Sequence, residues 1–341
     1  GGITLTITAI KDGNNQILTV TAKKGFSVSK IQAIRTLQNV LDAVEIALSL
    51  DCTGSMDDKA NPNSSSTKSR FDAQKEAALK FVSNLIILNQ DPNFTNKFKL
   101  GVMVFGIDAK WLKVGSQDIT PESGITLENI KNIISQNMGS TRANSSACTQ
   151  VMDATSVGSP LSKTRDYFQA TKKSKVKQIE VMITDGEPNT RIPDSKCQPN
   201  VFCPGYTTDP LTNLSYCSPG GNEYGWQCYN YSSYAGNDEL AQQTCVPLAR
   251  DFLKCTLATT KQSIGTNKFG TRDPEVDAYT VTIFTQPPGD IKSIMTKYST
   301  DYYNASEAGK LTGILDSVLA DIKAKLSSTI VSRVIPIPQT Q

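Results

Sequence analysis

Two apolar segments of the chain each end in an aspartate that is followed by turn-forming residues. The segment Val44 to Leu50 leads directly into Asp51, and the segment Ile179 to Thr184 leads into Asp185 and a glycine. Segments of this length and composition favour buried β-strands, and open α/β sheets bind ligands where parallel strands end. We therefore expect both carboxylates to lie at the carboxyl edge of one sheet.

Further oxygen donors accompany these two carboxylates. Thr53 and Ser55 follow Asp51 at alternate positions, and a turn-forming segment around Thr141 offers a third hydroxyl. Carboxylate and hydroxyl oxygens are hard donors that suit a divalent cation. The same residue types are ordinary turn and cap formers, so a purely structural role is the alternative. We expect the loop after Asp51 to be exposed, so that replacing Asp51 by Ala would leave the fold intact.

This combination resembles the von Willebrand factor A-type family. The metal-ion-dependent adhesion site of that family has the pattern Asp-x-Ser-x-Ser, a distant Thr, and a distant Asp followed by Gly. The matching residues here are Asp51, Thr53, Ser55, Thr141 and Asp185, with a threonine in place of the commoner first serine. The resemblance covers residues 44–326 and implies that the three hydroxyls contact the metal directly, while the aspartates often act through water.

The resemblance also implies a cofactor and a kind of partner. The ion would be Mg²⁺, with Mn²⁺ or Ca²⁺ as alternatives. Because neutral hydroxyls leave much of the ion's charge uncompensated, an acidic residue of a protein partner can complete the coordination. Such a site binds a partner and does not need to catalyse a reaction.

A weaker resemblance links the chain to TadG-like tight-adherence pilus assembly proteins. It is carried by a β segment before residues 51–56, by the step Tyr302 to Ala305, and by a closing helix. Proteins of that subgroup usually carry an N-terminal membrane-spanning helix. The chain has no run of about 18 apolar residues, so membrane attachment would require a segment absent from this chain.

The absence of histidine from all 341 residues limits the function further. It removes Ser-His-Asp and Cys-His nucleophile systems and the commonest zinc ligand. The net charge of +3 is small, and the local basic cluster at residues 172–177 is typical of a solvated turn. We therefore expect neither an enzyme nor a nucleic-acid-binding protein.

Eight cysteines indicate disulfides and hence an oxidising, extracytoplasmic location, either periplasmic, secreted or at the cell surface. Six of them fall within one stretch, whereas Cys52 and Cys148 stand apart. If the loops of Asp51 and Thr141 converge, Cys52 and Cys148 could form a bridge; the alternative is two buried thiols. The pairing of the other six stays open: Cys197, Cys203, Cys217, Cys228, Cys245 and Cys255.

Helical and strand-like segments alternate through most of the chain. The alternation predicts an α/β fold with a doubly wound, mostly parallel, Rossmann-like sheet of the von Willebrand factor A type. A Cys- and Tyr-rich insertion interrupts it. Alternating segments at both ends predict an accessory β element, with a hairpin at the N-terminus. The expected divisions are an N-terminal β segment at 1–43, the main domain at 44–326 with the insertion at 188–238, and a C-terminal β segment at 327–341.

These expectations combine into one functional hypothesis and one alternative. The first is an extracytoplasmic, metal-dependent adhesion or binding protein, associated with a surface appendage such as a pilus. The alternative is a structural subunit of an extracellular filament that self-associates through its terminal β strands, since exposed strand edges can pair with a neighbouring molecule.

Overall fold

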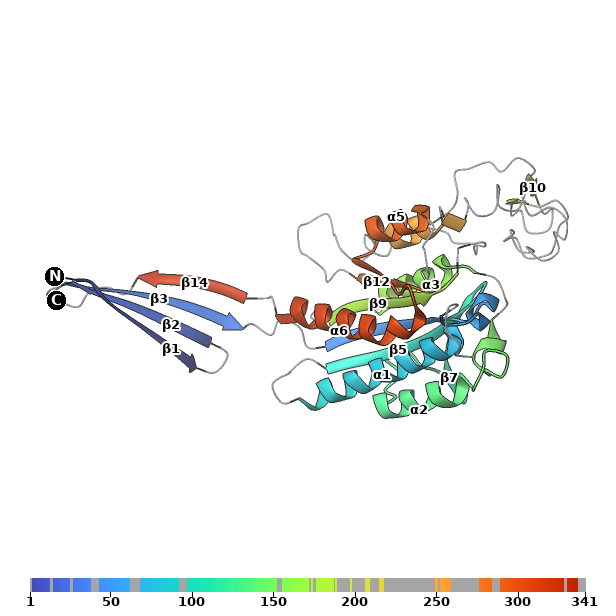
Figure 1. Cartoon of the computed structure of the whole chain (residues 1–341), viewed down its shortest axis with the longest axis horizontal. Helices are drawn as coiled ribbons and strands as arrows, with labels where there is room; N and C mark the ends of the chain where they lie inside the picture. Colours follow the sequence, from blue (N-terminus) through green and yellow to red (C-terminus); the bar gives the residue numbers. More distant parts are fainter. Residues whose placement is uncertain are drawn as a thin grey trace. The chain divides into compact units, whose positions relative to one another are not determined.

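The chain forms two compact units, residues 1–42 with 319–341 and residues 43–318 (Figure 1). The structure is a computed structural model, and it describes residues 2–12, 15–24, 27–37, 43–61, 68–91, 97–151, 155–171, 173, 176–186, 188, 197, 206–208, 215–217, 249–250, 252–258, 276–283, 289–327 and 330–336. Each unit has its own β-sheet.

The larger unit contains a six-stranded sheet in the order β13-β12-β9-β4-β5-β6. All neighbouring pairs are parallel except β5 and β6, which are antiparallel. This arrangement confirms the predicted α/β fold with a mostly parallel sheet. The strands are β4 (Ala43–Asp51), β5 (Lys97–Phe105), β6 (Ala109–Trp111), β9 (Val176–Thr184), β12 (Asp277–Thr282) and β13 (Asp301–Asn304).

Strand β4 lies between β5 and β9 and is buried along its whole length. Val44, Ile46 and Leu48 point to one face of the sheet, and Ala47 on the other face belongs to a second apolar cluster. Burial on both faces is typical of a central strand in a parallel sheet covered by helices on each side. The two-sided core therefore fixes where β4 ends and where Asp51 lies.

Helix α1 (Arg70–Gln90) covers one face of this sheet through a stripe that includes Phe71, Phe81 and Leu85. It begins with a capping box between Ser69 and Asp72, which satisfies backbone N–H groups at its first turn. The first part of helix α6 (Leu311–Ser327) is joined to α1 by a 2.6 Å hydrogen bond from Asn84 to Asp316. Helix α2 (Leu127–Asn137) packs against α1.

The opposite face is covered by α3 (Gly158–Ala170), by helical residues 249–250 and 252–258, and by α5 (Gly289–Tyr298). Their apolar side chains pack with strand residues such as Met103 and Met182 into one cluster. Short elements complete the unit. They are η1 (Gly54–Asp57), β7 (Lys113–Val114), β8 (Gln117–Asp118), η2 (Cys148–Gln150) and η3 (Ala308–Lys310).

The smaller unit is a four-stranded antiparallel sheet in the order β1-β2-β3-β14. Its strands are β1 (Thr4–Asp12), β2 (Asn15–Lys24), β3 (Ser27–Leu37) and β14 (Ile330–Pro336). The two chain ends thus join one sheet, which confirms the predicted accessory β element and its N-terminal hairpin. Strand β3, which was not predicted, lies between the hairpin and β14.

The predicted insertion at 188–238 lies mostly outside the described residues. Within it the structure gives Pro188, Cys197 and an antiparallel pair of short strands. These strands are β10 (Tyr206–Thr208) and β11 (Ser215–Cys217).

Candidate metal centre

Asp51 is the last residue of β4 and its side chain is fully buried. Its Oδ1 accepts a 2.8 Å hydrogen bond from the backbone N–H of Thr53, and its Oδ2 accepts a 2.6 Å bond from the Thr184 hydroxyl. The expectation of an exposed loop was therefore wrong for Asp51, and Cys52, Thr53 and Met56 are buried as well; the tolerance of the fold to Asp51→Ala stays a prediction. The carboxyl ends of β5 and β9 flank it, so the sheet encloses this carboxylate.

Asp185 follows the end of β9 and lies next to the loop of Asp51. Its Oδ1 accepts a 2.8 Å hydrogen bond from the Ser55 hydroxyl, and its Oδ2 accepts a 2.8 Å bond from Nη1 of Arg70. The Asp185 side chain is fully buried, whereas that of Arg70 is 21% exposed. The two aspartates expected at the carboxyl edge of the sheet are thus both there.

The hydroxyls of Thr53 and Ser55 provide a test of whether these residues fit a divalent cation. Their oxygens are 3.2 Å apart. In an octahedral Mg²⁺ site with ligands at about 2.1 Å, adjacent ligand oxygens are about 3 Å apart. Because Ser55 gives its proton to Asp185, a lone pair on its oxygen is left for a cation. The donor set and this spacing therefore fit a small divalent ion.

Thr141 is the one predicted ligand that the structure does not join to the others. It is exposed, and its hydroxyl accepts a 3.3 Å hydrogen bond from the backbone N–H of Asn144. Its segment is nevertheless tied to the first loop, since Arg142 bonds Asp57 at 2.8 Å and the backbone oxygen of Cys52 at 3.4 Å. Four of the five predicted ligands are thus gathered, and the fifth lies in a segment attached to them.

A disulfide joins the same two segments. Cys52 and Cys148, which the sequence suggested as a pair, are bridged with their Cα atoms 5.2 Å apart. A second disulfide links Cys197 and Cys255. The remaining candidates cannot be paired from the described residues: Cys203, Cys228 and Cys245 lie outside them, and Cys217 lies in β11.

Burial makes both carboxylates of the centre weaker acids than usual. The pKa of Asp51 is raised to about 7, first by desolvation and then by the charge of Asp185, against the hydrogen bonds from Thr184 and Thr53. Desolvation also raises the pKa of Asp185, and the Arg70 guanidinium and the Ser55 hydroxyl oppose that rise. Because a cation favours the ionised carboxylates, metal binding would release protons and strengthen as pH rises toward 8.

Sequence reasoning missed two residues that shape this centre, Arg70 and Gln74. Both lie in the first turns of α1, four positions apart and hence on one side of the helix. Gln74 is fully buried in an otherwise apolar stripe that includes Phe71, Ala78 and Phe81. A polar residue that interrupts an apolar stripe is a signal available in the sequence, although it does not reveal the partner.

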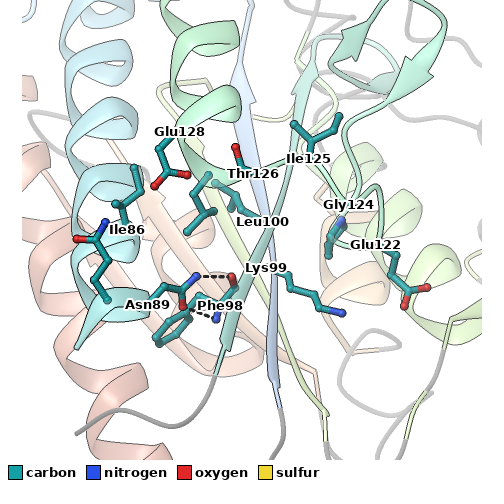
Figure 2. Close-up of a pocket in the computed structure, with 13 residues that line it drawn as sticks. Ile86, Asn89, Phe98, Lys99, Leu100, Glu122, Gly124, Ile125, Thr126 and Glu128 are labelled. Atoms are coloured by element: carbon teal, nitrogen blue, oxygen red, sulfur yellow. Dashed lines mark hydrogen bonds between the residues drawn. The ribbon is translucent and has the colours of Figure 1, made fainter. Parts of the chain in front are cut away.

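Other features of the described residues do not add a competing site. Among them, no three side chains of the Cys, Asp and Glu types gather as a metal cluster, so the centre depends on its hydroxyls. A cavity of about 380 Å³ lies at the amino end of β5, between α1 and the start of α2 (Figure 2). Its walls include Ile86, Leu100 and Ile125, and Asn89 bonds the backbone of Phe98 beside it. The cavity is therefore at the edge of the sheet opposite Asp51.

No helix in the described part of the chain combines the length and the apolar character needed to cross a membrane. No protein-family model and no curated protein sequence matches the chain.

Solved structures give likenesses over most of the chain. The pilus adhesin SpaC from Lactobacillus rhamnosus GG is 13% identical over 94% of this chain and 36% of its own, with a TM-score of 0.50. The pilus adhesin RrgA from Streptococcus pneumoniae is 11% identical over 97% of this chain and 49% of its own, with a TM-score of 0.45. Proximal thread matrix protein 1 from the mussel byssus, solved with a zinc-occupied MIDAS motif, is 11% identical over 90% of this chain and 50% of its own, with a TM-score of 0.41.

Of these three likenesses, the one to SpaC bears on the fold. At 13% identity the likeness to SpaC shows the fold alone, and this chain spans 36% of the length of SpaC. With its sheet order and its covering helices, the larger unit has the mostly parallel α/β fold that the resemblance to the von Willebrand factor A-type family implies. The polar centre occupies the carboxyl edge of that sheet, where such folds bind ligands.

Proposed function

We propose that the protein is an extracytoplasmic, metal-dependent binding protein that serves adhesion or the assembly of a surface appendage such as a pilus. The observation that carries this proposal is the pair of hydroxyls, Thr53 and Ser55, held 3.2 Å apart beside two buried carboxylates. The proposed ion is Mg²⁺, with Mn²⁺ or Ca²⁺ as alternatives.

Each residue has a distinct part in the proposed site. Thr53 and Ser55 offer oxygen donors directly, and Thr141 would join them as the third hydroxyl. Asp51 and Asp185 supply negative charge; Asp185 orients the Ser55 hydroxyl through a hydrogen bond, and Asp51 holds the backbone N–H of Thr53. The bound ion would supply a concentrated positive charge to which a carboxylate of a protein partner binds.

The location and the biological setting are part of the same proposal. Two disulfides, Cys52–Cys148 and Cys197–Cys255, support an oxidising compartment outside the cytoplasm. SpaC and RrgA are pilus adhesins, and the proposal extends that setting to this chain. The finer kinship with TadG-like tight-adherence proteins, and a role in binding without catalysis, belong to the proposal as well.

Binding of a synthetic peptide of alternating Glu and Ala residues tests the proposal directly. We expect the immobilised protein to bind this peptide in Mn²⁺, to release it in chelator, and to ignore the Gln–Ala counterpart. The variant Ser55→Ala should lose most of the metal-dependent signal, whereas Ser83→Ala on α1, whose hydroxyl bonds only its own helix at Leu79 among the described residues, should keep it. Binding that persists in chelator would contradict a metal-dependent site.

A second candidate function rests on the smaller unit. Strand β1 is an outer strand of its sheet; Leu5 and Ile7 on it, and Ile3 just before it, are 62–65% exposed. Long apolar edge strands can pair with another chain, so the unit could polymerise the protein into an extracellular filament. Chelator-resistant polymers that vanish in Ile7→Lys would support this function, and a monomer at all concentrations would exclude it.

A further inference from the structure

Arg70 lies between the buried carboxylate of the centre and the solvent. Its Nη1 bonds Asp185 at 2.8 Å on the inner side and contacts Asp58 at 3.3 Å on the outer side. Asp185 has a side chain without exposure, whereas the side chain of Asp58 is 65% exposed. Nη1 of Arg70 thus contacts two carboxylates: Asp185, which is fixed by burial, and Asp58, which is exposed and can be displaced.

The backbone holds Arg70 firmly in this position. It is the first residue of α1, directly after the capping residue Ser69, and its N–H donates a 2.9 Å bond to the backbone oxygen of Asp58. A β-bridge between Lys59 and Ser69 fixes the same two segments together. The N-terminal end of a helix also carries partial positive charge. The position of the guanidinium is therefore set by structure that does not depend on a bound ion.

Charge counting shows what this guanidinium does to the centre. The inner group of Asp51, Asp185 and Arg70 has a formal charge of −1 when both carboxylates are ionised. A bound divalent ion would bring the charge of this group to +1. Without the arginine, the two aspartates and the same ion would have a charge of zero. Arg70 also lies near the ligand hydroxyls, because it and Ser55 bond the two oxygens of the same carboxylate.

We infer that Arg70 is a second, permanent cation of the ligand-binding site, and that an acidic group of the partner protein replaces Asp58 on it. Asp58 marks the solvent side from which a carboxylate can reach Arg70. Nε and Nη2 of Arg70 make no hydrogen bond within the described part of the chain, so donors remain for an incoming carboxylate. This inference rests on the proposed metal-dependent function and assigns to its site a preference for partners with two closely spaced acidic groups.

Two substitutions with opposite expected effects test this role. In Arg70→Gln we expect Mn²⁺ affinity to rise about three- to tenfold, because a repelling charge is gone, and affinity for the Glu–Ala peptide to fall about tenfold. In Asp58→Asn we expect peptide affinity to rise about threefold and Mn²⁺ affinity to fall about twofold. A merely structural role for Arg70 would weaken both kinds of binding together.

Lys113→Gln is the matched control for the change in charge. Lys113 lies in β7 and contacts Asp118 at 3.7 Å, so its replacement should leave both affinities unchanged. Arg70→Lys keeps the charge and is the second test variant if Arg70→Gln does not fold. In Arg70→Lys we expect Mn²⁺ affinity to stay near that of the wild type and peptide affinity to fall about threefold.

The outcomes separate this inference from the proposed function. If the wild-type protein binds neither Mn²⁺ nor the peptide, the proposed function itself fails. If the wild type binds both, then equal affinities in Arg70→Gln, or a peptide affinity in Asp58→Asn that does not rise, overturn the role of Arg70 alone. Opposite shifts in the two variants establish it.

Discussion

Gln74 holds the backbone of Asp51 through two hydrogen bonds from one side-chain amide. The Asp51 N–H donates to Oε1 of Gln74 at 3.0 Å, and Nε2 of Gln74 donates to the Asp51 carbonyl at 2.9 Å. Both residues are fully buried. Helix α1 thereby supplies the hydrogen bonds that a neighbouring strand would supply where β4 ends. It also fixes the start of the loop that carries Thr53 and Ser55.

Replacing Gln74 by Leu should therefore damage both stability and the metal centre. The substitution leaves a buried N–H and a buried carbonyl without partners, which costs about 2–4 kcal/mol of unfolding free energy. We expect Mn²⁺ affinity to fall about tenfold as the loop shifts. Denaturant unfolding and metal titration measure the two effects, with the exposed Gln90→Leu at the end of the same helix as control. An unchanged Mn²⁺ affinity would show that Gln74 does not position the loop.

The disulfide between Cys52 and Cys148 should matter for the metal centre as well as for stability. It closes a loop with a sequence separation of 96, for which chain entropy predicts about 4.7 kcal/mol of stabilisation. A Cys52→Ala, Cys148→Ala double variant should unfold more easily and bind Mn²⁺ several-fold more weakly, because the Thr141 segment is no longer tied to the first loop.

The second disulfide provides the comparison. A Cys197→Ala, Cys255→Ala double variant should lose stability and keep its Mn²⁺ affinity, since neither cysteine adjoins a proposed ligand. Equal losses of affinity in the two double variants would mean that the Cys52–Cys148 bridge has no specific role at the centre.

Much of the fold follows from periodicity, whereas the centre is only partly readable in the sequence. The predicted strand at 44–50 is found as Ala43–Asp51, and the predicted closing helix is found as Leu311–Ser327. Apolar periodicity reports which residues are buried, so it locates such elements well. The predicted strand ends also placed Asp51 and Asp185 correctly, at the carboxyl edge of the sheet.

The contacts of Arg70, Gln74 and Thr141 could not be read in the same way. Arg70 meets Asp185 across 115 positions of sequence, and such a pairing depends on how α1 packs on the sheet. The Thr141 hydroxyl turns to its own segment because Asn144 offers a local donor. Strand β3 escaped prediction because its polar and apolar residues do not alternate regularly along residues 27–37.

Gly139 should tolerate a side chain poorly because its backbone and its surroundings both exclude one. Its φ is +60°, and an added Cβ would lie 2.7 Å from the backbone oxygen of Asn144. Gly139→Ala should lower the free energy of unfolding by about 2 kcal/mol. Gly115→Ala is the matched control, since Gly115 has a φ of +59° with open space around it and should cost about 1 kcal/mol. Equal costs would mean that the contact with Asn144 is unimportant.

Glu180 should make the fold less stable as pH rises. Its side chain is buried under α3 and accepts a 2.6 Å bond from Ser49, and desolvation raises its pKa from 4.5 to about 8. Below about pH 4.5 the carboxyl is neutral in both states; between there and about pH 8 only the unfolded chain ionises, so stability falls with pH at up to about 1.4 kcal/mol per unit.

The variant Glu180→Gln removes this titration. Thermal unfolding across that pH range should show a flatter profile for Glu180→Gln and a higher midpoint than the wild type near pH 8. The exposed Glu128→Gln serves as control and should follow the wild-type profile. Parallel profiles for the wild type and Glu180→Gln would show that this carboxyl does not hold its proton in the fold.

The metal centre itself is tested most directly by calorimetric titration of the oxidised protein with Mg²⁺ and Mn²⁺. We predict saturable binding at one site in the wild type and a loss of at least about 100-fold in affinity in Asp185→Asn, which keeps the shape of the side chain and removes its charge. Asp118→Asn on the β7–β8 hairpin should bind like the wild type. Absence of binding in the wild type, or equal binding in Asp185→Asn, would contradict a metal centre at Asp51, Thr53, Ser55 and Asp185.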